Sequence, residues 1–109
     1  MKNQKTESVE YCDNYYPETM EEFRAIQRSQ LDLFAAKQRD YGPNNIYMNG
    51  DTQLSLFALM VRMNDKLQRM FHLHKTKETP QNEPVIDCYQ DVSIYGIIAQ
   101  ILVSDRWGK

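Results

Sequence analysis

The sequence lacks the features that would place it in several large classes of protein. It has two cysteines, Cys12 and Cys88, with no CxxC motif and no Cys/His cluster, so it predicts neither a disulfide framework nor a zinc site. Its longest nearly unbroken apolar run, Ile94 to Val103, includes Gln100 and is about half of the ~20 residues that a membrane span needs. We therefore expect no membrane-spanning segment and interpret this run as a buried helix.

An excess of basic charge is also absent. The 13 Lys and Arg residues face 15 Asp and Glu residues, which gives a net charge of -2, unlike the one-signed basic surface of a duplex DNA binder. The first residues, MKNQKTESVEYCDNYYPE, contain no apolar stretch of the length that a signal peptide requires. These features predict a cytoplasmic protein that does not bind duplex nucleic acid, whereas a small phosphate ligand needs only a local basic cluster.

Three long helical segments carry almost all of the hydrophobic residues. A chain of 109 residues supports one core, and no strand-like alternation is present, so the predicted fold class is all-α. Residues 1–16 are interpreted as a polar, tyrosine-rich N-terminal arm and residues 17–109 as a single helical domain. The predicted helices run from about Pro17 to Tyr41, from Asp51 to His74, and from Pro84 to about Arg106.

The second of these helices is apolar almost all round in its first half, LSLFALMVRM. That pattern is expected of a central helix wedged between two others. Three helices of this length bury only part of two wide apolar faces, so we predict a compact bundle whose core is completed in a homodimer or a higher homo-oligomer.

A row of carboxylates opens the third predicted helix. Glu83, Asp87 and Asp91 follow one another at a spacing of four, at the head of a stripe that is otherwise apolar. Like charges on one helical face repel unless a cation neutralises them, and Mg2+ prefers such oxygen ligands. The alternative is a solvated acidic first turn that the helix dipole favours.

A basic cluster lies in one sector of the second helix, where Arg62, Asp65, Lys66 and Arg69 are three or four residues apart. They could form an exposed ladder of ion pairs. Alternatively, Arg62 interrupts the apolar run LMVRM and lies at the border of the core, where a guanidinium could grip a phosphate. Asp65 could then join the acidic group.

The stretch KQRDYGPNN ends the first helix. Its Gly-Pro pair explains the stop, because the glycine can adopt the left-handed conformation and the proline forbids continuation. Lys37, Asp40 and Tyr41 precede the stop, and Asn45 follows it. They are either ordinary helix-end and turn residues or the rim of a binding site.

The order of these motifs resembles a known family. K-x-x-D-Y-G, then R-x-x-D-K-x-x-R, then E-x-x-x-D-x-x-x-D-x-x-x-Y is similar to the nucleotide-modification-associated domain, type one, over Phe23 to about Val103. That family is frequent in phages and bacteria and looks like a compact relative of the MazG-type all-α nucleoside triphosphate pyrophosphohydrolases. The resemblance implies an oligomeric helical bundle that holds Mg2+ and a nucleotide, in the host cytoplasm if the protein is phage-encoded.

The family's site residues carry over by position, and no residue is assigned as catalytic. The resemblance implies Glu83, Asp87 and Asp91 as metal ligands, with Asp65 as a fourth. It implies nucleotide contacts by Lys37, Asp40, Tyr41, Asn45, Arg62, Lys66, Arg69 and Tyr95.

One departure from the pyrophosphohydrolase pattern leaves the activity open. Those enzymes carry E-x-x-E on the second helix, whereas this chain has R-x-x-D there. The first hypothesis is Mg2+-dependent hydrolysis of a nucleoside polyphosphate, in nucleotide metabolism or DNA modification. The alternative is a non-catalytic protein that binds and sequesters a cyclic or modified nucleotide signal, such as a phage anti-defence protein. A third possibility is a purely structural helical oligomer.

Overall fold

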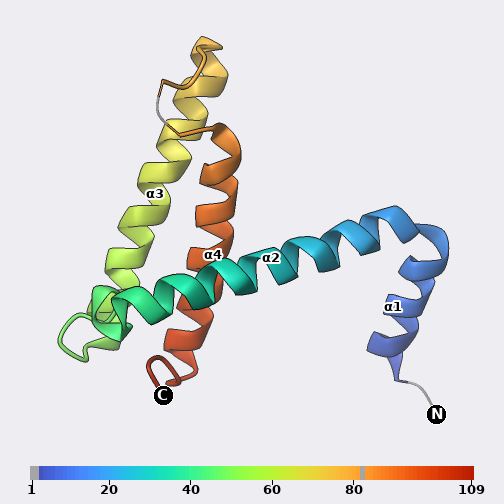
Figure 1. Ribbon diagram of the computed structural model, residues 1–109, viewed down its shortest axis with the longest axis horizontal. Coiled ribbons are helices and arrows are strands. Elements are labelled where there is room, and N and C mark those ends of the chain that lie inside the picture. The colour runs from blue at the N-terminus through green and yellow to red at the C-terminus, as the bar shows by residue number, and fades with distance from the viewer. Residues whose placement is uncertain (1–2, 82) are drawn as a thin grey trace. The chain divides into compact units, whose positions relative to one another are not determined.

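The structure is a computed structural model that describes residues 3–81 and 83–109. The described residues form four α-helices and one short 3-10 helix, with no β-strand (Figure 1). The predicted all-α class is therefore confirmed. In this part of the chain, no helix has the length and apolar character needed to cross a membrane. The helices are α1 (Gln4–Tyr15), α2 (Pro17–Tyr41), η1 (Pro43–Asn45), α3 (Thr52–Thr76) and α4 (Val85–Val103).

The chain divides into two compact units, Met1–Ala35 and Ala36–Lys109. In the first unit, α1 lies in the segment that the sequence analysis interprets as a polar, tyrosine-rich N-terminal arm. The Asn3 side chain caps α1 by accepting a hydrogen bond from the third residue of the helix, and no glycine or proline interrupts the segment. Arg24 of α2 donates two hydrogen bonds to the Asp13 carboxylate, at 2.8 and 3.1 Å, and this guanidinium lowers the pKa of Asp13.

The helix ends follow local chemistry. α2 ends where predicted, and Gly42 after it has a φ of 68°, a conformation that glycine adopts most readily. Asp51 caps α3 as predicted, because its side chain accepts a hydrogen bond from the Leu54 N–H at 3.0 Å. α3 continues two residues beyond the predicted end, to a left-handed Lys77. α4 ends three residues before the predicted end, because Asp105 takes a φ of 59°.

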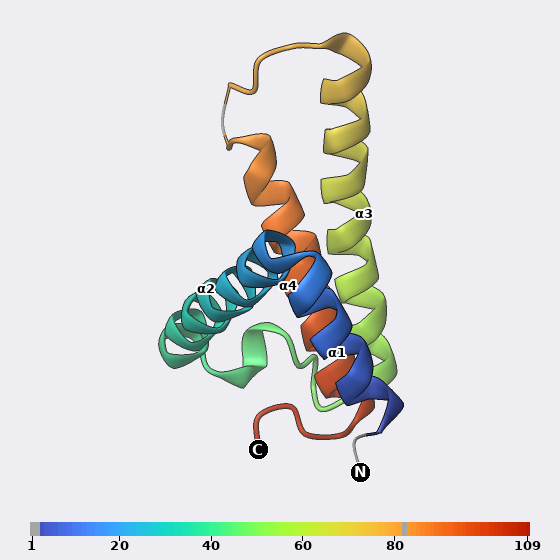
Figure 2. The ribbon, with the colours of Figure 1, turned by 90° about the vertical axis from the view of Figure 1, so that its right-hand side faces the viewer.

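α3 and α4 pack against each other as an antiparallel pair, joined by the segment 77–84 (Figures 1 and 2). Side chains on the contacting faces of the pair recur in alternating steps of four and three residues, which is the spacing of a coiled-coil seam. Lys66 faces Asp91, and Arg69 faces Cys88. Continuing the same steps toward the other end of the pair, we infer that Ser55, Leu59 and Arg62 lie at the levels of Leu102, Ile98 and Tyr95. The seam is thus apolar at the end near the C-terminus and polar at the end near segment 77–84.

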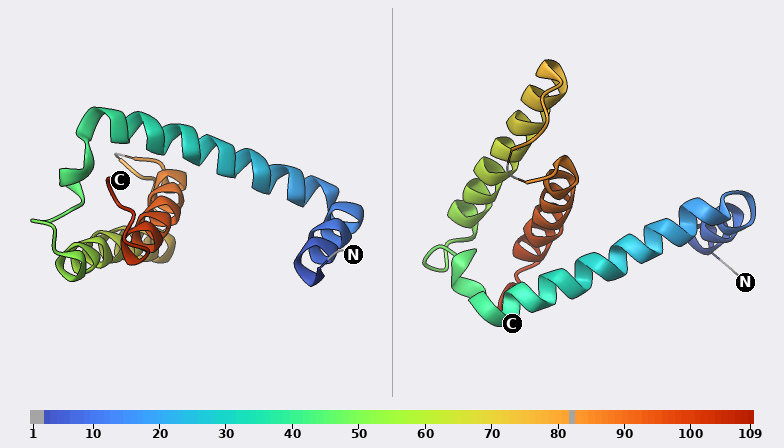
Figure 3. Two further views of the ribbon diagram at one scale, coloured as in Figure 1. Left: turned by 90° about the horizontal axis from the view of Figure 1, so that it is seen from below. Right: turned by 45° about the horizontal axis from the view of Figure 1, so that its top comes forward.

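The loop between α2 and α3, residues 42–51, is fixed by two side chains from elsewhere in the second unit. The buried Trp107 donates a hydrogen bond from its indole Nε1 to the Pro43 carbonyl at 3.0 Å, so the C-terminal segment turns back toward the loop (Figure 3). The fully buried Ser55 hydroxyl accepts a hydrogen bond from the Met48 N–H at 2.9 Å and donates one to the Asp51 carbonyl at 2.7 Å. The loop therefore has one fixed conformation beside the start of α3.

Large apolar side chains remain exposed on both helices of the pair. On α3 they lie mainly on the face turned away from α4, where the sequence predicted a second neighbouring helix, because among the described helices α3 is in contact with α4 alone. The prediction that an oligomer completes the core stays a prediction. The exposed apolar residues are Leu54, Phe57, Met60, Val61, Leu67 and Phe71 on α3 and Ile86, Tyr89, Ile97 and Val103 on α4.

Candidate functional site

A group of polar side chains, here called the polar layer, replaces the apolar seam between α3 and α4 near segment 77–84. It consists of Lys66, Arg69, Glu83, Cys88 and Asp91. The Lys66 ammonium lies between two carboxylates, 3.0 Å from Asp91 Oδ2 and 3.3 Å from Glu83 Oε2. The side chains of Lys66 and Asp91 are only 24% and 22% exposed. This ion-pair group therefore belongs to the packing between the helices more than to the surface.

Arg69 joins the same layer one turn further along α3. Its guanidinium donates hydrogen bonds to the Glu83 carbonyl oxygen and to Cys88 Sγ, the latter at 2.8 Å. Cys88 is fully buried. Arg69 therefore fixes the residues just before α4 onto α3, and two of its N–H groups are already in use.

The charge of Lys66 gives the stability of the protein a specific pH dependence. Its hydrogen bond with Asp91 raises the pKa of Lys66 above the usual value of 10.5, and Glu83 adds to that effect against the opposing effect of burial. Below pH 10.5 the folded and unfolded chains both keep this proton, so the stabilisation is complete there. It is lost as the pH rises through the higher pKa of the folded chain.

We therefore expect the free energy of unfolding to fall above pH 10.5, and to fall less steeply in Lys66→Arg. The reason is that a guanidinium keeps its charge at this pH. Urea unfolding of both proteins on either side of pH 10.5 measures the difference. If the free energy of unfolding falls equally steeply with pH in the two proteins, the charge of Lys66 is not the cause of the fall.

The four predicted metal ligands are not brought together. Within residues 3–81 and 83–109, no three His, Cys, Asp or Glu side chains lie close enough to one another to hold a metal ion. Glu83 and Asp91 converge on the Lys66 ammonium instead. Asp87 is half-buried, and Asp65 is exposed. In this arrangement these side chains do not form a Mg2+ site. The Mg2+ ligands inferred from the sequence therefore stay a prediction.

A second group of predicted residues meets where the loop 42–51 reaches α3. The Arg62 guanidinium donates a hydrogen bond to the Asn45 carbonyl oxygen at 3.2 Å. Arg62 is exposed, and no carboxylate among the described residues forms an ion pair with it. The seam places Tyr95, which is half-buried, at the same level of α4. Arg62 is therefore a charged group held in place but not neutralised.

The end of α2 leads directly into this second group. Lys37, Asp40 and Tyr41 are exposed, Tyr41 to 65%. Tyr41 precedes Asn45 by four residues along the fixed loop. Among the described residues, α3 and α4 are the only helices in contact with each other, so the structure does not bring these three α2 residues to Arg62 or Tyr95. We use the name loop edge for Lys37, Asp40, Tyr41, Asn45, Arg62 and Tyr95, of which only Asn45 and Arg62 are in contact. It contains six of the eight predicted nucleotide contacts, whereas Lys66 and Arg69 lie in the polar layer.

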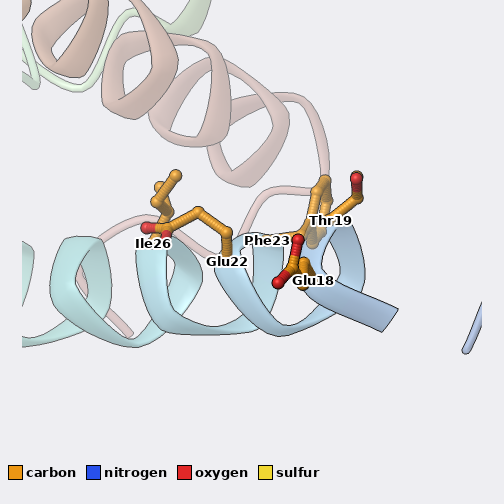
Figure 4. A pocket seen from close by; sticks show the side chains of 5 residues that line it. All are labelled: Glu18, Thr19, Glu22, Phe23 and Ile26. Carbon is orange, nitrogen blue, oxygen red and sulfur yellow. The ribbon is translucent and has the colours of Figure 1, made fainter. Parts of the chain in front are cut away.

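The first unit has a shallow apolar hollow, shown in Figure 4. Five side chains from three turns of α2 line it. One face of a single helix cannot enclose a ligand, so we do not assign a binding site there. The lining residues are Glu18, Thr19, Glu22, Phe23 and Ile26.

Two residues that hold the loop 42–51 in place were not among the predicted site residues. Ser55 is a single hydroxyl residue within the apolar run LSLFALM, and Trp107 is the only tryptophan of the chain. Both signals were available in the sequence, because a serine in a buried run and a lone tryptophan usually need a hydrogen-bond partner. The sequence does not show which groups these side chains bind. In the structure, both bind backbone groups of the loop 42–51.

The fold and these two groups define a small all-α protein with a helical pair, a polar layer within the pair and a basic edge beside it. Comparison of the chain with protein-family models, with curated proteins and with solved structures gave no match. The assignment of a function therefore depends on the residues of the loop edge and the polar layer.

Proposed function

We propose that this protein binds a nucleotide through its phosphate groups at the loop edge and does not cleave it. The observation that carries the proposal is the Arg62 guanidinium, which is held by the Asn45 carbonyl at 3.2 Å and has no acidic partner among the described residues. Within the described part of the chain, one of its five N–H donors makes a hydrogen bond. The remaining donors suit the bidentate recognition of a phosphate.

The other members of the loop edge supply contacts of the kinds that a nucleotide needs. Lys37 adds a second exposed cation at the end of α2. Tyr41 exposes most of its ring, and a base stacked on such a ring gains about 1–3 kcal/mol. The Asn45 side chain offers both a donor and an acceptor for a base or sugar.

The polar layer favours binding over hydrolysis. Its two carboxylates, Glu83 and Asp91, both form ion pairs with Lys66, so they are poor candidates for holding Mg2+ while those ion pairs persist. Mg2+-dependent hydrolysis, the first hypothesis from the sequence, would require Lys66 to leave both carboxylates. We derive no catalytic step from the present arrangement.

Titration calorimetry with nucleoside triphosphates and cyclic dinucleotides, with Mg2+ or with a chelator, tests this proposal. We expect Arg62→Ala to weaken the binding of the best ligand by about tenfold or more, which corresponds to about 1.4 kcal/mol for a lost charged contact. Lys75→Ala is the matched control, because Lys75 is an exposed cation near the other end of α3.

Three results would contradict the proposal. They are the absence of binding by any nucleotide, equal weakening by the two variants, and conversion of the bound nucleotide into hydrolysis products when Mg2+ is present. The ligand recovered after binding should be chromatographically intact. The melting temperature of Arg62→Ala without ligand shows whether the loop itself has been disturbed.

A further inference from the structure

α3 carries an apolar stripe on the side that α4 does not cover. The stripe, here called the outer stripe, consists of Phe57, Met60, Asn64, Leu67 and Phe71, which follow one another in steps of three, four, three and four. Phe57, Met60 and Phe71 are 61%, 58% and 65% exposed. A stripe with this spacing is a coiled-coil seam that lacks its second helix.

The positions that flank the outer stripe carry no charge. In a coiled coil, charged side chains at the flanking positions select the partner and its direction. Here one flank holds Leu56, Met63 and Met70, and the other holds Val61 and Gln68. Two copies of this surface would therefore meet without repulsion, and nothing in the surface selects a charged partner.

Asn64 is the only polar residue of the outer stripe and lies at its centre. Among residues 3–81 and 83–109, its Oδ1 accepts one long hydrogen bond of 3.5 Å, from Gln68 one turn along the same helix. An amide offers both donors and an acceptor, so an identical amide directly opposite satisfies it. A single asparagine of this kind at a seam position fixes the register of parallel coiled-coil dimers, at some cost in stability.

We propose that α3 of a second copy of this chain packs on the outer stripe, parallel and in register, with the two Asn64 side chains facing each other. Parallel pairing places each Asn64 opposite its own copy, whereas regular antiparallel packing places it opposite an apolar residue. The exposed apolar side chains of two such faces bury on the order of 1,000 Å², which is where specific interfaces begin. The proposal does not depend on nucleotide binding.

Sedimentation velocity over a range of protein concentrations tests the dimer. We expect the wild-type chain to be a dimer and Phe57→Glu to be a monomer, because the new carboxylate would be desolvated in the seam. Val103→Glu is the matched control, since Val103 is an exposed apolar residue on α4, and it should remain a dimer. The far-UV circular dichroism of both variants should show unchanged helix content.

A wild-type monomer at every concentration would overturn the proposal, because the outer stripe would then be covered by another part of the chain or by a different protein. Equal dissociation of Phe57→Glu and Val103→Glu would also overturn it, because the contact would then not be specific to α3.

The parallel register has its own test in a Cys12→Ser background, which leaves only the buried Cys88. We expect Leu67→Cys to form a disulfide-linked dimer with itself on mild oxidation. A disulfide that forms only in a mixture of Leu67→Cys and Phe57→Cys would indicate antiparallel pairing and overturn the proposed register. We also expect Asn64→Leu to produce species larger than a dimer, because the residue that fixes the assembly is lost.

Discussion

Replacing Leu102 by alanine is expected to lower the free energy of unfolding by about 2–5 kcal/mol. Leu102 is 2% exposed and lies opposite Ser55 at the apolar end of the seam. The substitution removes buried methyl groups and leaves a cavity between two helices whose backbones are held apart by the neighbouring layers. Urea unfolding followed by circular dichroism measures the loss.

Val103→Ala is the matched control for this substitution. Val103 is adjacent in the sequence but 71% exposed, so its truncation should change the free energy of unfolding by about 0.5 kcal/mol or less. Similar losses in the two variants would mean that the last turn of α4 is not packed in the described register.

Replacing Lys66 by methionine is expected to cost about 1–3 kcal/mol of stability. The change keeps most of the side-chain volume but leaves the carboxylates of Glu83 and Asp91 without their cation, and Asp91 is only 22% exposed. Removing one partner of a buried pair costs about 3–5 kcal/mol, and this group is partly open to solvent, which lowers the expected loss.

Two further variants separate the ion pair from simple packing. Lys66→Arg retains the charge and should lose less stability, and Lys75→Met removes an exposed lysine of α3 and should change little. In a double-mutant cycle, Asp91→Asn should cost less in the Lys66→Met background than in the wild type. Strict additivity of the two substitutions would show that Lys66 and Asp91 do not interact.

The helices of the fold could be predicted from sequence because their signals are local. The Gly-Pro stop after Tyr41 and the Asp51 cap each act within a few residues. The apolar stripes on the helices before and after them are longer than a typical strand. α1 was not predicted because it has almost no apolar stripe. Most of its residues are polar, which is also typical of a segment without regular structure.

The candidate site could be predicted only in part, because its geometry depends on which helices pack together. The sequence placed Lys66 in a basic cluster and Asp91 in an acidic row, but it could not show that the two rows face each other. Once α3 and α4 pack together, the Lys66 ammonium forms ion pairs with the carboxylates of Glu83 and Asp91. The spacing of the acids alone could not distinguish a metal from a lysine as their counter-ion.

Arg62 illustrates the opposite case. Its position as an interruption of an apolar run was visible in the sequence, and the structure indeed leaves it exposed at the border of the packed pair. What the sequence could not supply was the partner, the Asn45 carbonyl, which lies 17 residues earlier on the loop.

The hydrogen bond from Trp107 to Pro43 joins residues 64 positions apart, and it has a consequence for the order of biosynthesis. α2, the loop 42–51 and α3 are all synthesised before the indole that fixes the loop. The helical pair also needs α4 before its seam can close. The loop 42–51 can therefore take its described conformation only after α3, α4 and Trp107 have all been synthesised, which makes it a late-forming part of the second unit.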